Sequence, residues 1–205
     1  MPDCYIFAGG RQCQGHVHLN ITSGDLVIAA DSGYTCAKTI GVTPDILIGD
    51  LDSIAQIPDG LEVVRLPAEK DVTDTLAAID YGLSKGFKTF HIYGGLGGRL
   101  DHTFANIACL QYLANRGACG YLYGDRYTVT AFTGRLELTE RKRGTVSVFA
   151  YGGAAYGVTI TGLKYPLTNA DITTDFPVGI SNEFIGSAAT IEAQSGVILV
   201  VYPTV

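Results

Sequence analysis

Residues 89–115, TFHIYGGLGGRLDHTFANIACLQYLAN, decide the fold of the first half of the chain. A β-branched and aromatic run over 89–93 leads into four glycines within residues 94–98, and a helical pattern follows. The apolar residues of that helix recur at the spacing of one helix face: Phe104, Ile107, Leu110 and Leu113. A strand joined through a glycine loop to an amphipathic helix is typical of a sheet of parallel strands.

The same alternation extends outward over residues 1–125. A second helix is predicted over residues 73–83, where Leu76, Ile79 and Leu83 form one apolar stripe. Strands that alternate with helices predict an α/β domain with a mainly parallel sheet and flanking helices on both faces. The other predicted strands are 4–8, 26–30, 46–48, 61–66 and 121–123.

Residues 126–205 have a different periodicity, because closely spaced strands with glycines between them replace the helical pattern. This favours a small antiparallel β-sandwich or barrel. We therefore expect two domains, an α/β domain over 1–125 and an all-β domain over 126–205. The strands expected in the second domain are 127–133, 145–150, 158–161, 188–193 and 197–202.

Composition excludes several classes of protein. The 205 residues are 47% hydrophobic, enough to bury a core, and the 14 basic against 20 acidic residues give a net charge of −6. No basic stripe predicts nucleic-acid binding, and no apolar stretch approaches the ~18 residues of a membrane span. The five cysteines lack a C-x-x-C spacing, so we expect reduced, mostly buried cysteines in a cytoplasmic protein without a membrane anchor.

Polar residues of the first half gather just after its predicted strands. In open α/β sheets, this edge is where ligands bind, so four such clusters predict a single site. The clusters are Asp31-Ser32-Gly33, Gly49-Asp50-Leu51-Asp52-Ser53, Lys70-Asp71-Val72-Thr73-Asp74, and the segment from Gly94 to His102.

Asp50 and Asp52 form a D-x-D pair. On an extended backbone, residues two apart project to the same side, and their Cα atoms are roughly 6.6 Å apart. The two carboxylates could then coordinate one hard cation. The alternative is a turn in which each Asp caps local backbone amides.

Asp74 lies in the first turn of its predicted helix, opposite the apolar stripe. Its carboxylate could favour the positive end of the helix, or it could reach back as a third metal ligand to the strand ends that hold Asp50 and Asp52. Oxygen ligands without Cys or His favour Mg²⁺ or Ca²⁺ over Zn²⁺.

The glycine loop 94–98 leads through Arg99 into a helix start at Asp101 and His102. Glycine lets the backbone approach a phosphate, and a helix N-terminus offers free amide donors. The loop matches neither G-x-x-x-x-G-K-[ST] nor G-x-G-x-x-G, but Arg99 can bind phosphate bidentately, which strengthens the ligand interpretation. His102 could contact a nucleotide or cap the helix.

Five motifs in this order resemble those of the thiamin pyrophosphokinase family, over nearly the whole chain. They are Asp31-Ser32-Gly33, Gly49-Asp50-Leu51-Asp52-Ser53, Lys70-Asp71-x-Thr73-Asp74, Gly97-Gly98-Arg99-Leu100-Asp101-His102 and Gly179-Ile180-Ser181-Asn182-Glu183. The resemblance implies a diphosphotransferase in which the hydroxyl of thiamin attacks the β-phosphorus of Mg²⁺-bound ATP in line, giving thiamin diphosphate and AMP. It also implies a homodimer with active sites between the α/β domain of one subunit and the β domain of the other.

The resemblance assigns the site residues as well. Mg²⁺ would be held by Asp50, Asp52 and Asp74, and catalysis would use these three with Arg99 and Asp101. The residues assigned to ATP are Asp31, Ser32, Gly33, Lys70, Gly97, Gly98, Arg99 and His102. Those assigned to thiamin are Thr73, Asp74, Ser181 and Asn182. Because the chain has no Trp, an aromatic that stacks on thiamin must be Phe or Tyr, and Phe184 is a candidate.

Two other functions stay open at this point. The same nucleotide half could serve a diphosphokinase for another heterocyclic alcohol, such as a pterin. Alternatively, the chain could be a nucleotide-binding regulator whose β domain senses a ligand without turnover; loss of Asp50, Asp52 and Asp74 would favour that hypothesis, and all three are present.

Overall fold

The computed structural model describes residues 1–10, 19–52, 60–67, 69 and 71–204. It divides into two compact units. The first comprises Met1–Cys109 with Tyr121–Asp125, and the second comprises Leu110–Gly120 with Arg126–Val205. We keep residues 125 and 126 as the proposed boundary between the two functional halves.

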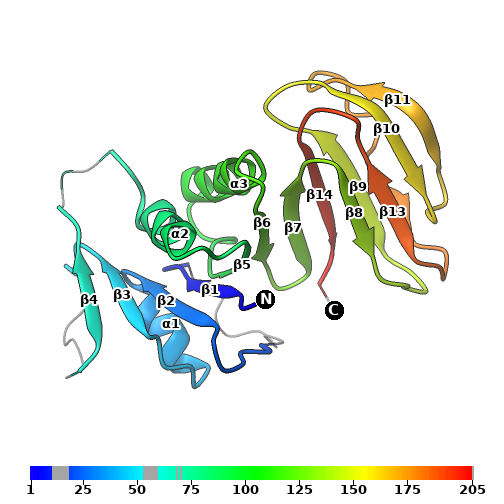
Figure 1. Cartoon of the computed structure of the whole chain (residues 1–205). Helices are drawn as coiled ribbons and strands as arrows, with labels where there is room; N and C mark the ends of the chain where they lie inside the picture. The colour runs from blue at the N-terminus through cyan, green and yellow to red at the C-terminus, as the bar shows by residue number, and fades with distance from the viewer. Residues whose placement is uncertain (11–18, 53–59, 68, 70, 205) are drawn as a thin grey trace. The chain divides into compact units, whose positions relative to one another are not determined.

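The first unit is built on a mainly parallel sheet with the strand order β6-β5-β1-β2-β3-β4 (Figure 1). The strands β1, β2, β3 and β5 pair in parallel, with Ile6 facing both Ile28 and Ile92 in the register, and β4 pairs in parallel with β3 at the outer end of this order. These strands are β1 (Cys4–Phe7), β2 (Leu26–Ala30), β3 (Ile46–Gly49), β4 (Glu62–Arg65), β5 (Thr89–Tyr93) and β6 (Cys119–Tyr123). The predicted α/β sheet is therefore confirmed.

Helices cover both faces of this sheet. Tyr5 and Phe7 of β1 share an apolar cluster with Cys36 and Ala37 of α1 (Gly33–Thr39). Alternate residues of a strand point to opposite faces, so Cys4 lies on the other face, against α2 (Asp74–Ser84). Figure 1 shows α1 and α2 on opposite sides of the sheet. The third helix is α3 (Leu100–Ala114).

The predicted apolar stripe of α2 is wrong in its orientation. The buried residues are Thr75, Ala78, Ile79 and Gly82, whereas Leu76 and Leu83 are half-buried. The reason is the close approach at Gly82, where an added Cβ would lie 2.6 Å from Phe90 Cε1. A helix that packs through small residues comes closer to the sheet, and its larger side chains move to the rim.

The predicted face of α3 is also wrong in part. Leu110 and Leu113 are buried as expected, but Phe104 exposes 62% of its surface. Asn106 and Cys109 are buried instead, so the inward face of α3 includes a polar side chain.

The second unit is a β-sandwich. One sheet has the order β12-β9-β14-β7 and the other the order β11-β10-β13-β8, with antiparallel pairs throughout. Val148 of β9, Val200 of β14 and Ile160 of β10 belong to one apolar core that the two sheets share. The strands are β7 (Tyr127–Phe132), β8 (Arg135–Leu138), β9 (Thr145–Ala150), β10 (Ala155–Thr161), β11 (Leu167–Ile172), β12 (Asn182–Glu183), β13 (Ala189–Glu192) and β14 (Ile198–Pro203). The predicted small antiparallel sandwich is confirmed.

The cysteines depart from expectation at one position. Cys4 and Cys109 are buried free thiols, and burial raises the pKa of Cys109 to about 11, so both stay protonated at neutral pH. Cys36 is disulfide-bonded, so the expectation that all the cysteines are reduced is wrong there. Among the described residues, no helix is both long and apolar enough to span a membrane.

Candidate active site

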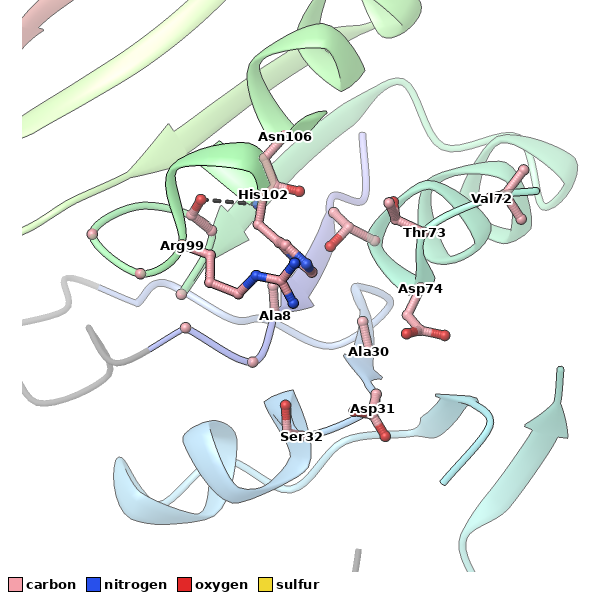
Figure 2. A pocket seen from close by; sticks show the side chains of 17 residues that line it. Ala8, Ala30, Asp31, Ser32, Val72, Thr73, Asp74, Arg99, His102 and Asn106 are labelled. Carbon is pink, nitrogen blue, oxygen red and sulfur yellow. Dashed lines mark hydrogen bonds between the residues drawn. The ribbon is translucent and has the colours of Figure 1, made fainter. Parts of the chain in front are cut away.

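A cavity of about 650 Å³ opens at the carboxyl ends of the parallel strands of the first unit (Figure 2). It lies where the strand order reverses, since β1 has β2 on one side and β5 on the other. Such a switch point is the usual ligand crevice of an open α/β sheet. Five segments line it: residues 8–10 after β1, residues 30–32 at the end of β2, residues 72–75 around the start of α2, the loop residues 94, 95, 97 and 98 after β5, and Arg99, His102 and Asn106 at and after the start of α3.

Glycine brings the backbone of two of these segments into close contact. The Gly10 N–H donates to the Gly94 carbonyl at 2.9 Å, and a Cβ atom at Gly10 would lie 2.0 Å from that oxygen. A side chain at Gly9 would in the same way collide with the Ser32 hydroxyl. Sequence reasoning missed this segment, although two consecutive glycines directly after the first strand were a visible signal.

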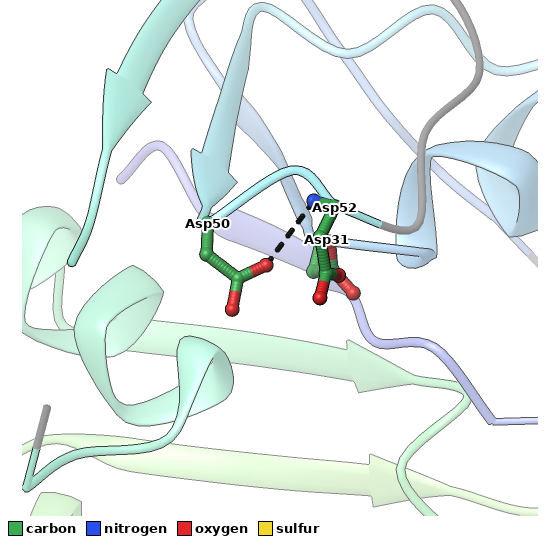
Figure 3. A group of neighbouring side chains, drawn as sticks. All are labelled: Asp31, Asp50 and Asp52. Carbon is green, nitrogen blue, oxygen red and sulfur yellow. Dashed lines mark hydrogen bonds between the residues drawn. The ribbon is translucent and has the colours of Figure 1, made fainter. Parts of the chain in front are cut away.

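Three carboxylates gather beside the cavity. Single oxygens of Asp31, Asp50 and Asp52 lie within 4.8 Å of one another (Figure 3). Asp31 follows β2 and Asp50 follows β3, and the Asp31 N–H donates to the Ile48 carbonyl at 2.8 Å, which fixes the two strand ends side by side. The resemblance assigns Asp31 to the nucleotide, whereas the structure places its carboxylate with those of Asp50 and Asp52.

The backbone of this cluster is not extended: of the two alternatives for Asp50 and Asp52, the structure has the turn. Leu51 has a positive φ of 67°, and the Asp52 N–H donates to Asp50 Oδ1 at 3.3 Å. Asp50 and Asp52 thus form a turn in which the Asp50 carboxylate accepts from the Asp52 amide. Both carboxylates still lie close to that of Asp31 (Figure 3). Leu51 is buried in a cluster with Ala29 and Leu47, which holds a backbone conformation that a leucine rarely adopts.

Like charge dominates the electrostatics of the cluster. The Asp50 carboxylate raises the pKa of Asp52, with smaller contributions from Asp31 and Asp74. Carboxylates that repel one another favour a bound cation, and an all-oxygen set suits a hard ion such as Mg²⁺. The donor chemistry therefore fits the metal implied by the sequence, with Asp31 as an additional ligand candidate.

Asp74 lies at the N-terminus of α2 and lines the cavity on the same side as Asp31 (Figure 2). The helix begins there because the Thr73 hydroxyl caps it, accepting from the Leu76 N–H at 3.2 Å. The tight oxygen cluster does not include Asp74, although its charge acts on Asp52. Its role as a metal ligand stays a prediction.

Arg99 and Asp101 form a two-pronged ion pair at the start of α3. Arg99 Nη2 donates to Asp101 Oδ2 at 2.6 Å, and Nε donates to Oδ1 at 3.2 Å. This pairing lowers the pKa of the Asp101 carboxyl and raises that of Arg99. Arg99 lines the cavity and Asp101 does not, so Asp101 orients the guanidinium.

His102 and Asn106 follow on the cavity side of α3 (Figure 2). His102 lies inside the first turn rather than at the cap position, because α3 begins at Leu100, which favours the ligand-facing alternative. Asn106 is 5% exposed, and its Nδ2 donates to the Gly95 carbonyl at 2.9 Å. Sequence reasoning missed Asn106; a polar residue on an otherwise apolar helix face was the available signal.

The structure does not bring every predicted residue to this cavity. Ser32, Thr73, Gly97 and Gly98 line it, but Gly33 does not. At Gly33 the helix packs against β1, where an added Cβ would lie 1.8 Å from the Phe7 carbonyl oxygen. Lys70 lies outside the described residues.

Ser181 and Asn182 belong to the second unit. Ser181 is exposed with a φ of 60°, and its N–H donates to Ser147 Oγ at 3.2 Å. Asn182 is only 5% exposed, and its amide clamps the backbone of Tyr165: Oδ1 accepts from the Tyr165 N–H at 2.9 Å, and Nδ2 donates to the Tyr165 carbonyl at 2.7 Å. Asn182 therefore holds a loop, and the adjacent Ser181 is the accessible member of the pair.

The structure contradicts the stacking role suggested for Phe184. Its ring is 4% exposed and belongs to the core of the sandwich, where Arg141 lies 5.5 Å from the ring centroid. Tyr165, which Asn182 clamps, exposes 54% of its surface. Tyr165 thus offers an exposed aromatic ring in this region, and Lys164 Nζ lies over it, 5.3 Å from the ring centroid.

Comparison with known proteins gives a consistent result over both halves of the chain. Residues 17–119 match the model of the thiamin pyrophosphokinase catalytic domain, and residues 135–198 match that of the thiamin pyrophosphokinase vitamin B1 binding domain. A thiamine pyrophosphokinase of Bacillus subtilis is 31% identical over 190 residues, 87% of each chain.

Solved structures agree with these matches. The crystal structure of thiamine pyrophosphokinase from Bacillus subtilis superposes with a TM-score of 0.87 at 28% identity, over 99% of each chain. That of thiamin pyrophosphokinase from Geobacillus thermodenitrificans gives 0.81 at 26% identity, over 99% of this chain and 98% of the other.

Proposed function

The chain belongs to the thiamin pyrophosphokinase family, and from this premise we propose that it transfers the diphosphate of Mg²⁺-bound ATP to the hydroxyl of thiamin, releasing AMP. The chain is a transferase of the thiamin diphosphokinase type, and the resemblance to this family is confirmed. One observation carries the proposal: a cavity at the switch point of the sheet joins a glycine loop, an arginine and a carboxylate cluster.

The nucleotide side of the site follows from charge and backbone geometry. The glycine loop after β5 lets a triphosphate approach main-chain atoms, and Arg99 offers a bidentate donor that Asp101 keeps in position. Diphosphate transfer depends mainly on holding two reactants in line and on neutralising developing charge. In this proposal His102 and Ser32 contact the nucleotide.

Mg²⁺ fits the carboxylate cluster, and we assign Asp31, Asp50 and Asp52 to hold it, with Asp74 beside them. When bound, the ion would neutralise phosphate charge and fix the orientation of the phosphates. The negative charges of these carboxylates repel one another when no cation is bound, and a bound cation relieves this repulsion, which supports the assignment.

Thiamin would be recognised from two directions. Thr73 and Asp74 line the cavity, and in this proposal they bind the end of thiamin that carries the acceptor hydroxyl. Ser181 with Tyr165 would contact the heterocycle from the β domain of the partner subunit in the proposed homodimer. We retain the homodimer and the cytoplasmic location as parts of this proposal. Size-exclusion chromatography with light scattering tests the dimer.

The decisive experiment measures AMP release from Mg²⁺-ATP by the purified protein, with and without thiamin, and identifies the product by mass. Thiamin-dependent AMP and a product with two added phosphates support the proposal. AMP release that requires a pterin alcohol instead would redirect it to another acceptor. Tight ATP binding without AMP at any Mg²⁺ concentration would favour the regulator hypothesis.

A further inference from the structure

Asn106 occupies an unusual place on α3. Arg99, His102 and Asn106 all line the cavity, at helical spacings of three and four residues, so they share one face of the helix. The first two lie in exposed positions, whereas Asn106 is 5% exposed. A buried amide facing a ligand cavity needs hydrogen-bond partners, and its contacts therefore indicate its role.

The partner of Asn106 is the backbone of the glycine loop. Its Nδ2 donates to the Gly95 carbonyl at 2.9 Å (Figure 2). The carbonyls of the two preceding residues are held in the same way, but by the main chain: Tyr93 accepts from the Ala8 N–H at 2.8 Å and Gly94 accepts from the Gly10 N–H at 2.9 Å. Three successive carbonyls thus accept hydrogen bonds, two from backbone N–H groups and the third from a side chain.

The Gly95 carbonyl takes its hydrogen bond from a side chain because the chain turns away from the sheet at this point. Gly94 has a φ of 71° and Gly97 a φ of 76°, so the loop leaves the direction of β5. Gly95 is closely packed at its Cα, since an added Cβ would lie 2.5 Å from Leu122 Cδ1 and 3.1 Å from Asn106 Nδ2. A loop with four glycines in five residues has little conformational preference of its own. A hydrogen bond that holds one of its residues in place therefore reduces the conformational entropy that the loop loses when it binds phosphate.

We propose that Asn106 is a positioning residue for the nucleotide: through the Gly95 carbonyl it holds the glycine loop ready for the phosphates of ATP. The inference rests on the proposed function. It assigns to Asn106 an effect on ATP affinity rather than on the chemical step, because Asn106 acts through the loop.

Asn106→Leu and Asn106→Asp test the proposal. Leucine keeps the branched shape and the number of heavy atoms of the side chain but removes both polar atoms. Aspartate keeps the shape and an oxygen, and it has no hydrogen-bond donor when ionised. The matched control is Asn115→Leu, at an exposed position just after α3. The measurements are KM for ATP, kcat with thiamin, and calorimetric binding of Mg²⁺ with α,β-methylene-ATP, in which the bond that would break is inert.

We expect Asn106→Leu to raise the KM for ATP and the Kd of the analogue about tenfold, the size expected when one buried carbonyl loses its partner. The kcat and the KM for thiamin should change less than threefold, and Asn115→Leu should match the wild type.

Asn106→Asp adds a pH signature. A protonated carboxyl can again donate to the Gly95 carbonyl, so the affinity of this variant for the analogue, relative to wild type at the same pH, should improve between pH 8 and pH 5.5. The other charged or ionisable groups that line the cavity, Arg99, His102, Asp31 and Asp74, are the same in both proteins, so the ratio removes their contribution. Asn106→Leu should show a constant ratio.

Wild-type affinity for the analogue in both folded variants would overturn the inference, as would a loss confined to kcat or to thermal stability. The proposed function fails separately: a wild-type protein that binds the analogue but releases no AMP with thiamin refutes the activity, and the analogue-binding comparison still tests Asn106.

Discussion

Replacing Asn182 by alanine should weaken the second unit before it affects chemistry. The Asn182 amide makes three hydrogen bonds, two to the backbone of Tyr165 and one from the Glu183 N–H at 2.9 Å. At about 1 kcal/mol net for each bond, part of it regained from water at the half-buried loop, the loss is about 2–3 kcal/mol. For a chain of this length, this lowers Tm by roughly 4–12 °C.

The assay combines thermal unfolding with thiamin kinetics. Asn182→Asp retains the acceptor for both N–H groups, but it buries a carboxylate oxygen against the Tyr165 carbonyl, so its Tm should fall at least as far at neutral pH. Asn115→Ala, at an exposed position, should shift Tm by no more than about 2 °C. Because Asn182 presents Tyr165, the KM for thiamin should rise in Asn182→Ala while the KM for ATP stays constant. If Asn182→Ala left Tm unchanged and strongly raised the KM for thiamin, the structural role of Asn182 would be refuted, and Asn182 would instead contact the ligand directly.

Three further predictions concern the first unit. Asp52→Asn should abolish transfer and the Mg²⁺-dependent rise in Tm while leaving the circular dichroism spectrum unchanged, since it removes a metal charge from an exposed side chain; near-normal turnover would contradict the assignment. The raised pKa of Asp52 means that the ionised carboxylate destabilises the folded, metal-free protein above that pKa. The gain in Tm of Asp52→Asn over wild type should therefore be largest at neutral pH and vanish below the unfolded carboxyl value of about 3.9, whereas a pH-independent gain would rule out this origin. Arg99→Lys should raise the KM for ATP about tenfold, because lysine cannot form the bidentate contact, and Asp101→Asn should raise it in the same direction; an effect of Arg99→Lys alone would show that Asp101 does not orient Arg99.

The sequence predicted the architecture because periodicity is a local property. The parallel strands of the first unit and the sandwich of the second both follow from runs that can be read within ten residues. The orientation of the helices could not be predicted in this way. At α2, the closeness allowed by Gly82 outweighs the larger apolar surface of Leu76 and Leu83, and only the packed structure reveals this balance.

The site was predictable as a set of strand ends but not as a set of contacts. The spacing of Asp50 and Asp52 leaves both an extended pair and a turn open, and the two carboxylates converge on a left-handed turn at Leu51. Asn182 was expected at a ligand, and it bonds the main chain of Tyr165, 17 residues away in sequence. Both arrangements depend on hydrogen bonds and backbone angles that residue spacing does not encode.

The outer strand of the parallel sheet bears on how the protein behaves during expression. β4 is four residues long, its valines Val63 and Val64 are half-buried, and the charged Glu62 and Arg65 stand exposed at its two ends. Charges on a short edge strand discourage it from adding to the edge of another sheet. Neutral substitutions at Glu62 and Arg65 would leave a short apolar template at the sheet margin, and insoluble product would then appear without any change to the catalytic groups.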